Sequence, residues 1–215
     1  MGILIRHGLR PLDTLGQLQG GWKRVGRQVA GSPLEEVSDV WWLQVGAVFA
    51  DLRVCRDERI ENGLLDASQA FSGAVGVFAG TVTFRHDLDT EYWGESDRAH
   101  LFRGVDLLVE VGRNYLERWS RITATGADRG VVIEMRGGVV SRPLVFALQR
   151  PAPDLRIVAT GVYAIAIWDK GRSGGAAFSR GEKGWEVLAR VGDQSGFSSA
   201  LSCFLADAQR PPFDG

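Results

Sequence analysis

Apolar and polar side chains alternate with a period of two residues through much of the chain. In the segment TVTFRHDLDT, residues 81–90, this period places Val82, Phe84, His86 and Leu88 on one face and charged or hydroxyl side chains on the other. Such alternation is typical of a half-buried β-strand. The histidine on the apolar face is the informative residue, because a buried polar group needs either a hydrogen-bond partner or a function.

Other segments repeat the same pattern. Residues 40–54 predict a hairpin around a turn at Gly46, and residues 70–80 and 81–89 predict a second pair of strands. Further strands are expected in the segments 99–104, 106–112, 114–123, 131–136, 142–150, 156–169 and 184–192. Turn signals separate these runs at short intervals, which favours an all-β antiparallel sandwich or barrel. Strands and helices do not alternate, so a parallel nucleotide-binding sheet is not expected.

One segment near the end of the chain has a helical period instead. Residues 195–208 carry apolar side chains at i, i+3, i+4, i+7 and i+8, from Phe197 to Leu205, which predicts a C-terminal amphipathic helix. The expected organisation has three parts, which are an irregular segment at 1–39, a first barrel module at 40–125 and a second β module with the helix at 126–215. The two modules are two small barrels, or they close together as one domain.

The composition of the chain excludes several classes of function. The chain has 215 residues and a net charge of −1, so bulk electrostatics give no reason to expect a nucleic-acid or acidic-membrane partner. No apolar run is long enough for a secretory signal or a membrane span, and Cys55 and Cys203 form no paired motif. We therefore expect a cytoplasmic protein with reduced thiols.

Neither a metal nor a cofactor is expected from the motifs. His7, His86 and His100 are the three histidines of the chain, and their spacing does not suit chelation. The glycine-rich pieces match neither dinucleotide-binding nor phosphate-loop spacing.

Two titratable residues are the first candidates for a site inside a barrel. An antiparallel barrel of about eight strands has an interior that holds packed side chains or one small ligand. His86 is either a core histidine with satisfied nitrogens or an acid–base or hydrogen-bonding group facing the lumen. Glu117 shares a face with Tyr115 and Trp119, where desolvation would raise the pKa of its carboxyl and suit it to act as a general acid. Alternatively, Glu117 faces solvent or pairs with an arginine across the strand.

A charged pair and a set of aromatic residues complete the candidate site. Asp51 and Arg53 lie two residues apart on one strand face, where they form either a surface ion pair or a lumen pair that orients a polar ligand. The aromatic residues expected to line a ligand pocket are Trp42, Phe49, Phe84, Tyr115 and Trp119. Each of these is also compatible with an ordinary barrel core.

Several segments in order resemble a known group. VWWLQVGAVFADLRV, AFSG, FRHDLDT, LLVEVG and YLERWSRI are similar to segments of lipocalin-like, or calycin-type, barrel proteins and of the yeast Hri-type family. Ala70–Gly73, Leu88–Thr90 and Glu117–Trp119 occupy the matching places, although Arg118 stands where the family has leucine. The resemblance covers residues 40–122 and implies barrel-like modules. It implies no catalytic residue, because the function of the family is not well established.

Three functions follow from these expectations. The first is a binding module that holds a small apolar or aromatic ligand. The second is a cofactor-independent isomerase, lyase (dehydratase) or cyclase in the same pocket, with His86 as base, Glu117 as acid, and Asp51 and Arg53 as positioning groups. The third is a protein-interaction module whose strand edges pair with another chain, most simply as a homodimer.

Overall fold

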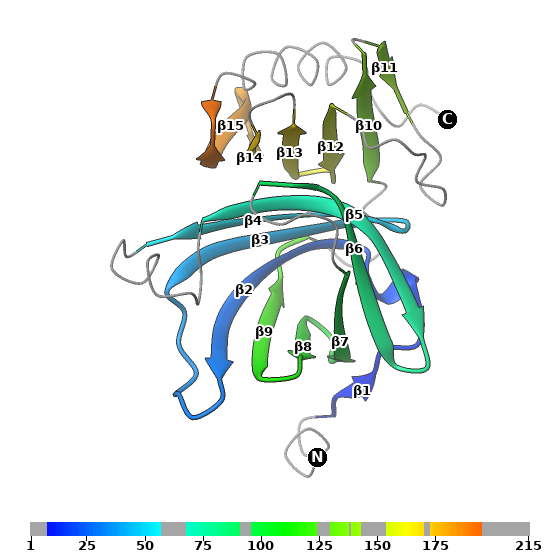
Figure 1. Cartoon of the computed structure of the whole chain (residues 1–215), viewed down its shortest axis with the longest axis vertical. Coiled ribbons are helices and arrows are strands. Elements are labelled where there is room, and N and C mark those ends of the chain that lie inside the picture. Colours follow the sequence, from blue (N-terminus) through cyan, green and yellow to red (C-terminus); the bar gives the residue numbers. More distant parts are fainter. Residues whose placement is uncertain are drawn as a thin grey trace.

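The computed structural model describes residues 8–56, 68–90, 96–123, 130–137, 139–142, 154–169 and 173–194. Eight antiparallel strands in this part form a closed barrel (Figure 1). They are β2 (Gly20–Val29), β3 (Ser38–Val45), β4 (Val48–Cys55), β5 (Gln69–Phe78), β6 (Thr81–Asp89), β7 (Ser96–Arg103), β8 (Leu107–Val111) and β9 (Tyr115–Arg121). Each strand pairs with the next one along the chain, and β9 pairs back with β2. The predicted all-β fold and antiparallel barrel are confirmed.

The N-terminal segment contributes to the barrel. It contains β1 (Arg10–Pro11), which pairs with β7, the 3-10 helix η1 (Leu15–Leu18), and the whole of β2. The expectation that residues 1–39 are irregular is therefore wrong for β2, without which the barrel would stay open. The glycines and charges of Gly20–Val29 obscure the alternation there, and a bulge interrupts it.

The remaining strands form a second, open sheet. Its order is β11 (Val139–Ser141), β10 (Val131–Arg136), β12 (Leu155–Ala159), β13 (Tyr163–Asp169), β14 (Ser173–Gly181) and β15 (Gly184–Gly192). Its two edge strands do not pair with each other in the described ranges, so this part is not a second barrel. The predicted C-terminal helix at 195–208, and most of the predicted strand at 142–150, lie outside the described residues.

The second sheet packs across the outside of the barrel. Figure 1 shows it spanning the outer surface of β3, β4 and β5. Leu43, Ala50 and Leu52 of the barrel meet Val158 and Ile165 of the sheet in one buried apolar cluster. A separate cluster fills part of the barrel interior. Residues on both faces of β3 and β4 are consequently buried, which explains the apolar runs VWWL in β3 and VFA in β4. No helix in the described ranges is both long and apolar enough to cross a membrane.

A β-bulge in β6 changes which side chains face inward. Gly73 pairs with His86 and Ser72 pairs with Leu88, so Asp87 has no pairing partner and the alternation shifts by one residue. Leu88 therefore packs outside the barrel, against the second sheet, and not beside His86 as the simple alternation predicts. Asp89 turns inward and comes within hydrogen-bond distance of His86.

The bulge depends on a glycine at position 73. A Cβ atom there would collide with the backbone carbonyl of Arg85, whereas a Cβ at Gly76 on the same strand would meet nothing. We expect Gly73→Ala to lower the free energy of unfolding by about 3 kcal/mol, because the backbone must shift to accept it. Gly76→Ala is the matched control and should have little effect. Equal urea denaturation midpoints for the two variants would contradict this account of the bulge.

Candidate functional site

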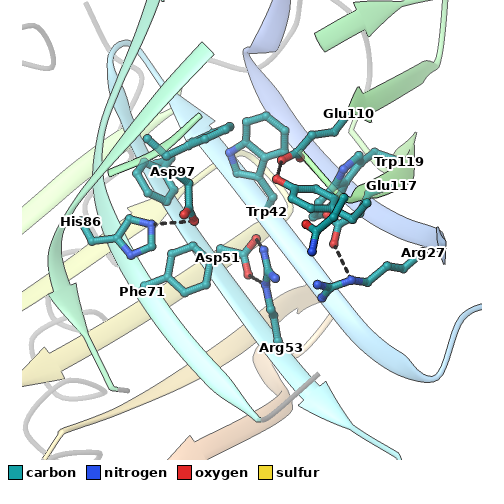
Figure 2. Close-up of a pocket in the computed structure, with 14 residues that line it drawn as sticks. Arg27, Trp42, Asp51, Arg53, Phe71, His86, Asp97, Glu110, Glu117 and Trp119 are labelled. Carbon is teal, nitrogen blue, oxygen red and sulfur yellow. Dashed lines mark hydrogen bonds and ion pairs between the residues drawn. The ribbon is translucent and has the colours of Figure 1, made fainter. Parts of the chain in front are cut away.

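The barrel encloses a cavity of about 280 Å³. All nine candidate residues chosen from the sequence line it, namely Trp42, Phe49, Asp51, Arg53, Phe84, His86, Tyr115, Glu117 and Trp119 (Figure 2). They come from strands β3, β4, β6 and β9, whose alternation directs these side chains to the barrel interior. Asp97, whose side chain is 68% exposed, lies where the cavity meets solvent.

Aromatic rings form much of the cavity wall. The ring centroid of Trp42 lies 5.5 Å from those of Phe84 and Trp119, and both pairs have edge-to-face geometry. Phe49 makes a further edge-to-face pair with Phe84 at 5.4 Å. Interlocked rings of this kind stabilise the wall and hold its shape. The Nε1 group of Trp119 is buried and has no hydrogen-bond partner in the described part of the chain.

Asp51 and Arg53 form the lumen-facing pair that was one of the two sequence alternatives. The Nε atom of Arg53 donates to Oδ1 of Asp51 at 2.9 Å, and its guanidinium lies 4.9 Å from the ring centroid of Phe71. Burial raises the pKa of the Asp51 carboxyl, and the adjacent Arg53 opposes that shift. The pair therefore presents a fixed guanidinium to the cavity.

Glu117 is held by arginines, as the second sequence alternative proposed. The Nη1 atom of Arg24 donates to Oε1 of Glu117 at 2.8 Å, and Nε of Arg27 lies 3.6 Å from the same oxygen. A bulge at Val25 in β2 turns both arginines inward, although they are three residues apart. Arg24 also donates two hydrogen bonds to Glu36, which fixes the position of its guanidinium beside Glu117. The Glu117 carboxyl therefore lies in the cavity wall as the partner of arginine side chains.

His86 has one satisfied nitrogen and one open nitrogen. Its Nδ1 lies 2.7 Å from Oδ2 of Asp89, and its ring stacks on Phe71 with centroids 4.4 Å apart. Because a carboxylate only accepts hydrogen bonds, Nδ1 carries the proton in this contact. The Nε2 atom has no hydrogen-bond partner in the described part of the chain and lies 3.7 Å from Asp97 (Figure 2). In the neutral ring, Nε2 is thus available to accept a proton.

Glu110 is the main functional candidate that the sequence did not reveal. Burial, together with nearby Glu117, raises the pKa of its carboxyl to about 8. Tyr115 donates its hydroxyl to Oε1 of Glu110 at 2.7 Å, and burial and the same carboxyl raise the pKa of Tyr115. The Glu110 carboxyl is therefore mostly protonated at neutral pH, the property that the sequence had suggested for Glu117.

The reason for missing Glu110 is that both faces of β8 are buried. In the sequence, the charged Asp106 and Glu110 alternate with the apolar Val109, which suggests that Val109 faces inward. In the structure, the face that carries Leu108 and Glu110 points into the barrel instead. The other missed lining residues are Arg27, Phe71, Asp97 and Asn114. The register between β8 and β9 would have identified Glu110, because it pairs directly with Glu117.

No group of three metal-ligating side chains in the described ranges is arranged to hold a metal ion. Comparison of the chain with protein-family models, with curated proteins and with solved structures found no match.

Proposed function

We propose that the barrel binds one small organic molecule in its interior cavity. The observation that carries this proposal is an aromatic-walled cavity of about 280 Å³ into which several polar side chains project. Its volume lies just below the range of about 300–1,000 Å³ that is common for small-molecule sites. A ligand of roughly one ring with a short substituent fits this space.

The barrel architecture supports the proposal. Eight strands joined in an up-and-down order also build the lipocalins, and barrels of this size hold one small ligand. The Trp119 Nε1 and His86 Nε2 atoms, which have no hydrogen-bond partner among the described residues, are a second support, since buried polar atoms in native proteins usually have partners. A ligand acceptor atom would satisfy the Trp119 donor.

Two neighbouring tryptophans give a matched test. Trp42 lines the cavity, whereas Trp41 lies on the other face of β3, beneath Lys23. We expect Trp42→Phe to weaken binding of a small aromatic compound by about tenfold, because it removes contact area and an edge-to-face partner. Trp41→Phe should leave the affinity unchanged. Isothermal titration calorimetry checks both, and equal effects of the two substitutions would argue against a site in the barrel.

A cofactor-independent acid–base enzyme is the second candidate. It is favoured by the His86–Asp89 pair, which leaves Nε2 as a base, and by Glu110, which holds a proton at neutral pH. In this proposal Glu110 replaces Glu117 as the acid. The base would remove a proton next to a carbonyl group, and the acid would donate to the developing enolate oxygen.

Deuterium exchange tests the enzymatic candidate. If the site is catalytic, the wild-type protein should accelerate exchange of the α-protons of phenylacetone in deuterium oxide, followed by proton NMR. His86→Gln should reduce the accelerated rate by about a hundredfold, the size of effect typical of a positioned base, without loss of ketone binding. Unaccelerated exchange in the wild type, with binding intact, would remove this candidate and leave the binder.

A further inference from the structure

Glu110 is a buried carboxyl of the cavity that has no ion-pair partner in the described part of the chain, since Arg53, which is bound to Asp51, acts on it only at longer range. The Asp51 carboxylate pairs with Arg53, and that of Glu117 pairs with Arg24. In the described part of the chain, no cationic group lies within ion-pair distance of Glu110, which is 7% exposed and accepts only the Tyr115 hydroxyl. The cavity therefore holds a site where a positive charge would be stabilised.

The charged groups of the cavity wall also favour a positively charged ligand. The cavity lining contains four carboxyl groups, those of Asp51, Asp97, Glu110 and Glu117, but only two guanidinium groups, those of Arg27 and Arg53. Arg24 adds a third guanidinium from behind Glu117. With Glu110 protonated, three carboxylates, those of Asp51, Asp97 and Glu117, are balanced by these three guanidiniums. Ionisation of Glu110 adds a negative charge, which a cationic ligand would balance and an anionic ligand would not.

The aromatic wall also suits a cation. Tryptophan, tyrosine and phenylalanine faces attract ammonium groups through the ring quadrupole, most strongly in desolvated sites. Tyr115, which contacts Glu110, and Trp119 stand on β9, the strand that pairs with the strand of Glu110. One ammonium group near Glu110 would thus lie in a cavity that has both a carboxylate and aromatic rings in its wall.

We propose, on the premise that the barrel binds a small molecule, that its ligand is an organic ammonium ion with a single ring and that Glu110 is the counter-ion. The ammonium displaces the proton of the Glu110 carboxyl. The O–H bond breaks, the proton passes to the buffer, and the carboxylate pairs with the ligand.

Proton release is the signature of this exchange. The raised pKa of Glu110, about 8, means that the carboxyl is mostly protonated at neutral pH. Binding at pH 7 should release about one proton per ligand, and the affinity should rise between pH 6 and pH 8. The titratable and charged groups that face Glu110 or the same cavity are Arg24, Arg27, Asp51, Arg53, His86, Asp97, Tyr115 and Glu117. The variant Glu110→Gln removes the Glu110 carboxyl and leaves all of these groups in place, so a loss of proton release in the variant is due to Glu110.

Three probes of nearly equal size test the ligand class. Phenethylamine, phenethyl alcohol and phenylacetate share one ring and differ in charge. Calorimetry at pH 7, in buffers of different ionisation enthalpy, gives both affinity and protons released. We expect phenethylamine to bind about tenfold or more tightly than the alcohol, as a charged hydrogen bond allows. Glu110→Gln should remove that difference and the proton release, while the exposed control Glu182→Gln should change neither.

The outcomes separate this inference from the proposed function. If the alcohol or phenylacetate binds as tightly as the amine, the ligand class is wrong and the small-molecule site stands. If Glu110→Gln binds the amine as tightly as the wild type, Glu110 is not the counter-ion. If none of the three probes binds, both proposals fail.

Discussion

Glu110→Gln is expected to stabilise the protein at pH 9 by about 4 kcal/mol relative to the wild type, and to change its stability little at pH 5. The Glu110 carboxyl has its pKa raised to about 8 in the folded protein by burial and by Glu117, from an ordinary value of 4.5. The protonated Glu110 carboxyl makes its full contribution to folding stability below pH 4.5. This contribution is lost as the pH rises through 8. Glutamine has nearly the same shape and cannot ionise, so the variant escapes this loss.

Urea denaturation at pH 5 and pH 9 measures the effect. The quantity of interest is the difference between variant and wild type, because other titrating groups are common to both proteins. Glu182→Gln, in the exposed turn between β14 and β15, controls for the loss of a carboxyl without burial. A difference between Glu110→Gln and the wild type that is the same at both pH values would show that Glu110 is ionised throughout.

Arg156→Met is expected to lower the free energy of unfolding by about 3 kcal/mol, because buried Glu134 keeps Arg136 but loses its second guanidinium, and Asp87 loses the same partner. Arg156 is fully buried between the barrel and the second sheet. Its guanidinium donates to Glu134 on the same sheet at 2.7 Å, and to Ser72 and Asp87 of the barrel at 3.2 Å and 3.3 Å. The residue therefore links the two layers.

Two further variants show whether the cost arises from the weakened pairing of the Glu134 carboxylate. Arg98→Met removes an exposed arginine of β7 and should have little effect on the denaturation midpoint. Adding Glu134→Leu to Arg156→Met should recover part of the lost stability, since replacing both buried partners is less costly than removing one. If the double variant is less stable than Arg156→Met, packing and not charge dominates this contact.

The alternation of side chains was sufficient to place the candidate residues. Period-two patterning in residues 40–54, 81–86 and 115–119 put Trp42, Asp51, His86 and their neighbours on faces that the structure directs into one cavity. This worked because each strand is regular over the part that lines the cavity. The sequence could not choose between the alternatives for Glu117, since its partner Arg24 lies 93 residues away along the chain.

Two bulges account for much of what the sequence did not predict. A bulge lets residues three apart face the same side, which brings Arg24 and Arg27 to Glu117 and Asp89 to His86. A pattern of period two assigns each of these pairs to opposite faces. The open second sheet was also not predictable, because strand runs alone do not say whether a sheet closes.

The indole N–H resonances of the tryptophans test the central claim, that the barrel interior is the ligand site, most directly. A proton–nitrogen NMR spectrum would follow them during titration with whichever of the three probes binds most tightly. We predict that the Trp42 and Trp119 signals shift, and that those of Trp41, outside the barrel, and Trp168, whose Nε1 donates to the Asp193 carbonyl in the second sheet, do not. Shifts confined to Trp41 or Trp168, with Trp42 and Trp119 unchanged, would contradict a ligand site inside the barrel.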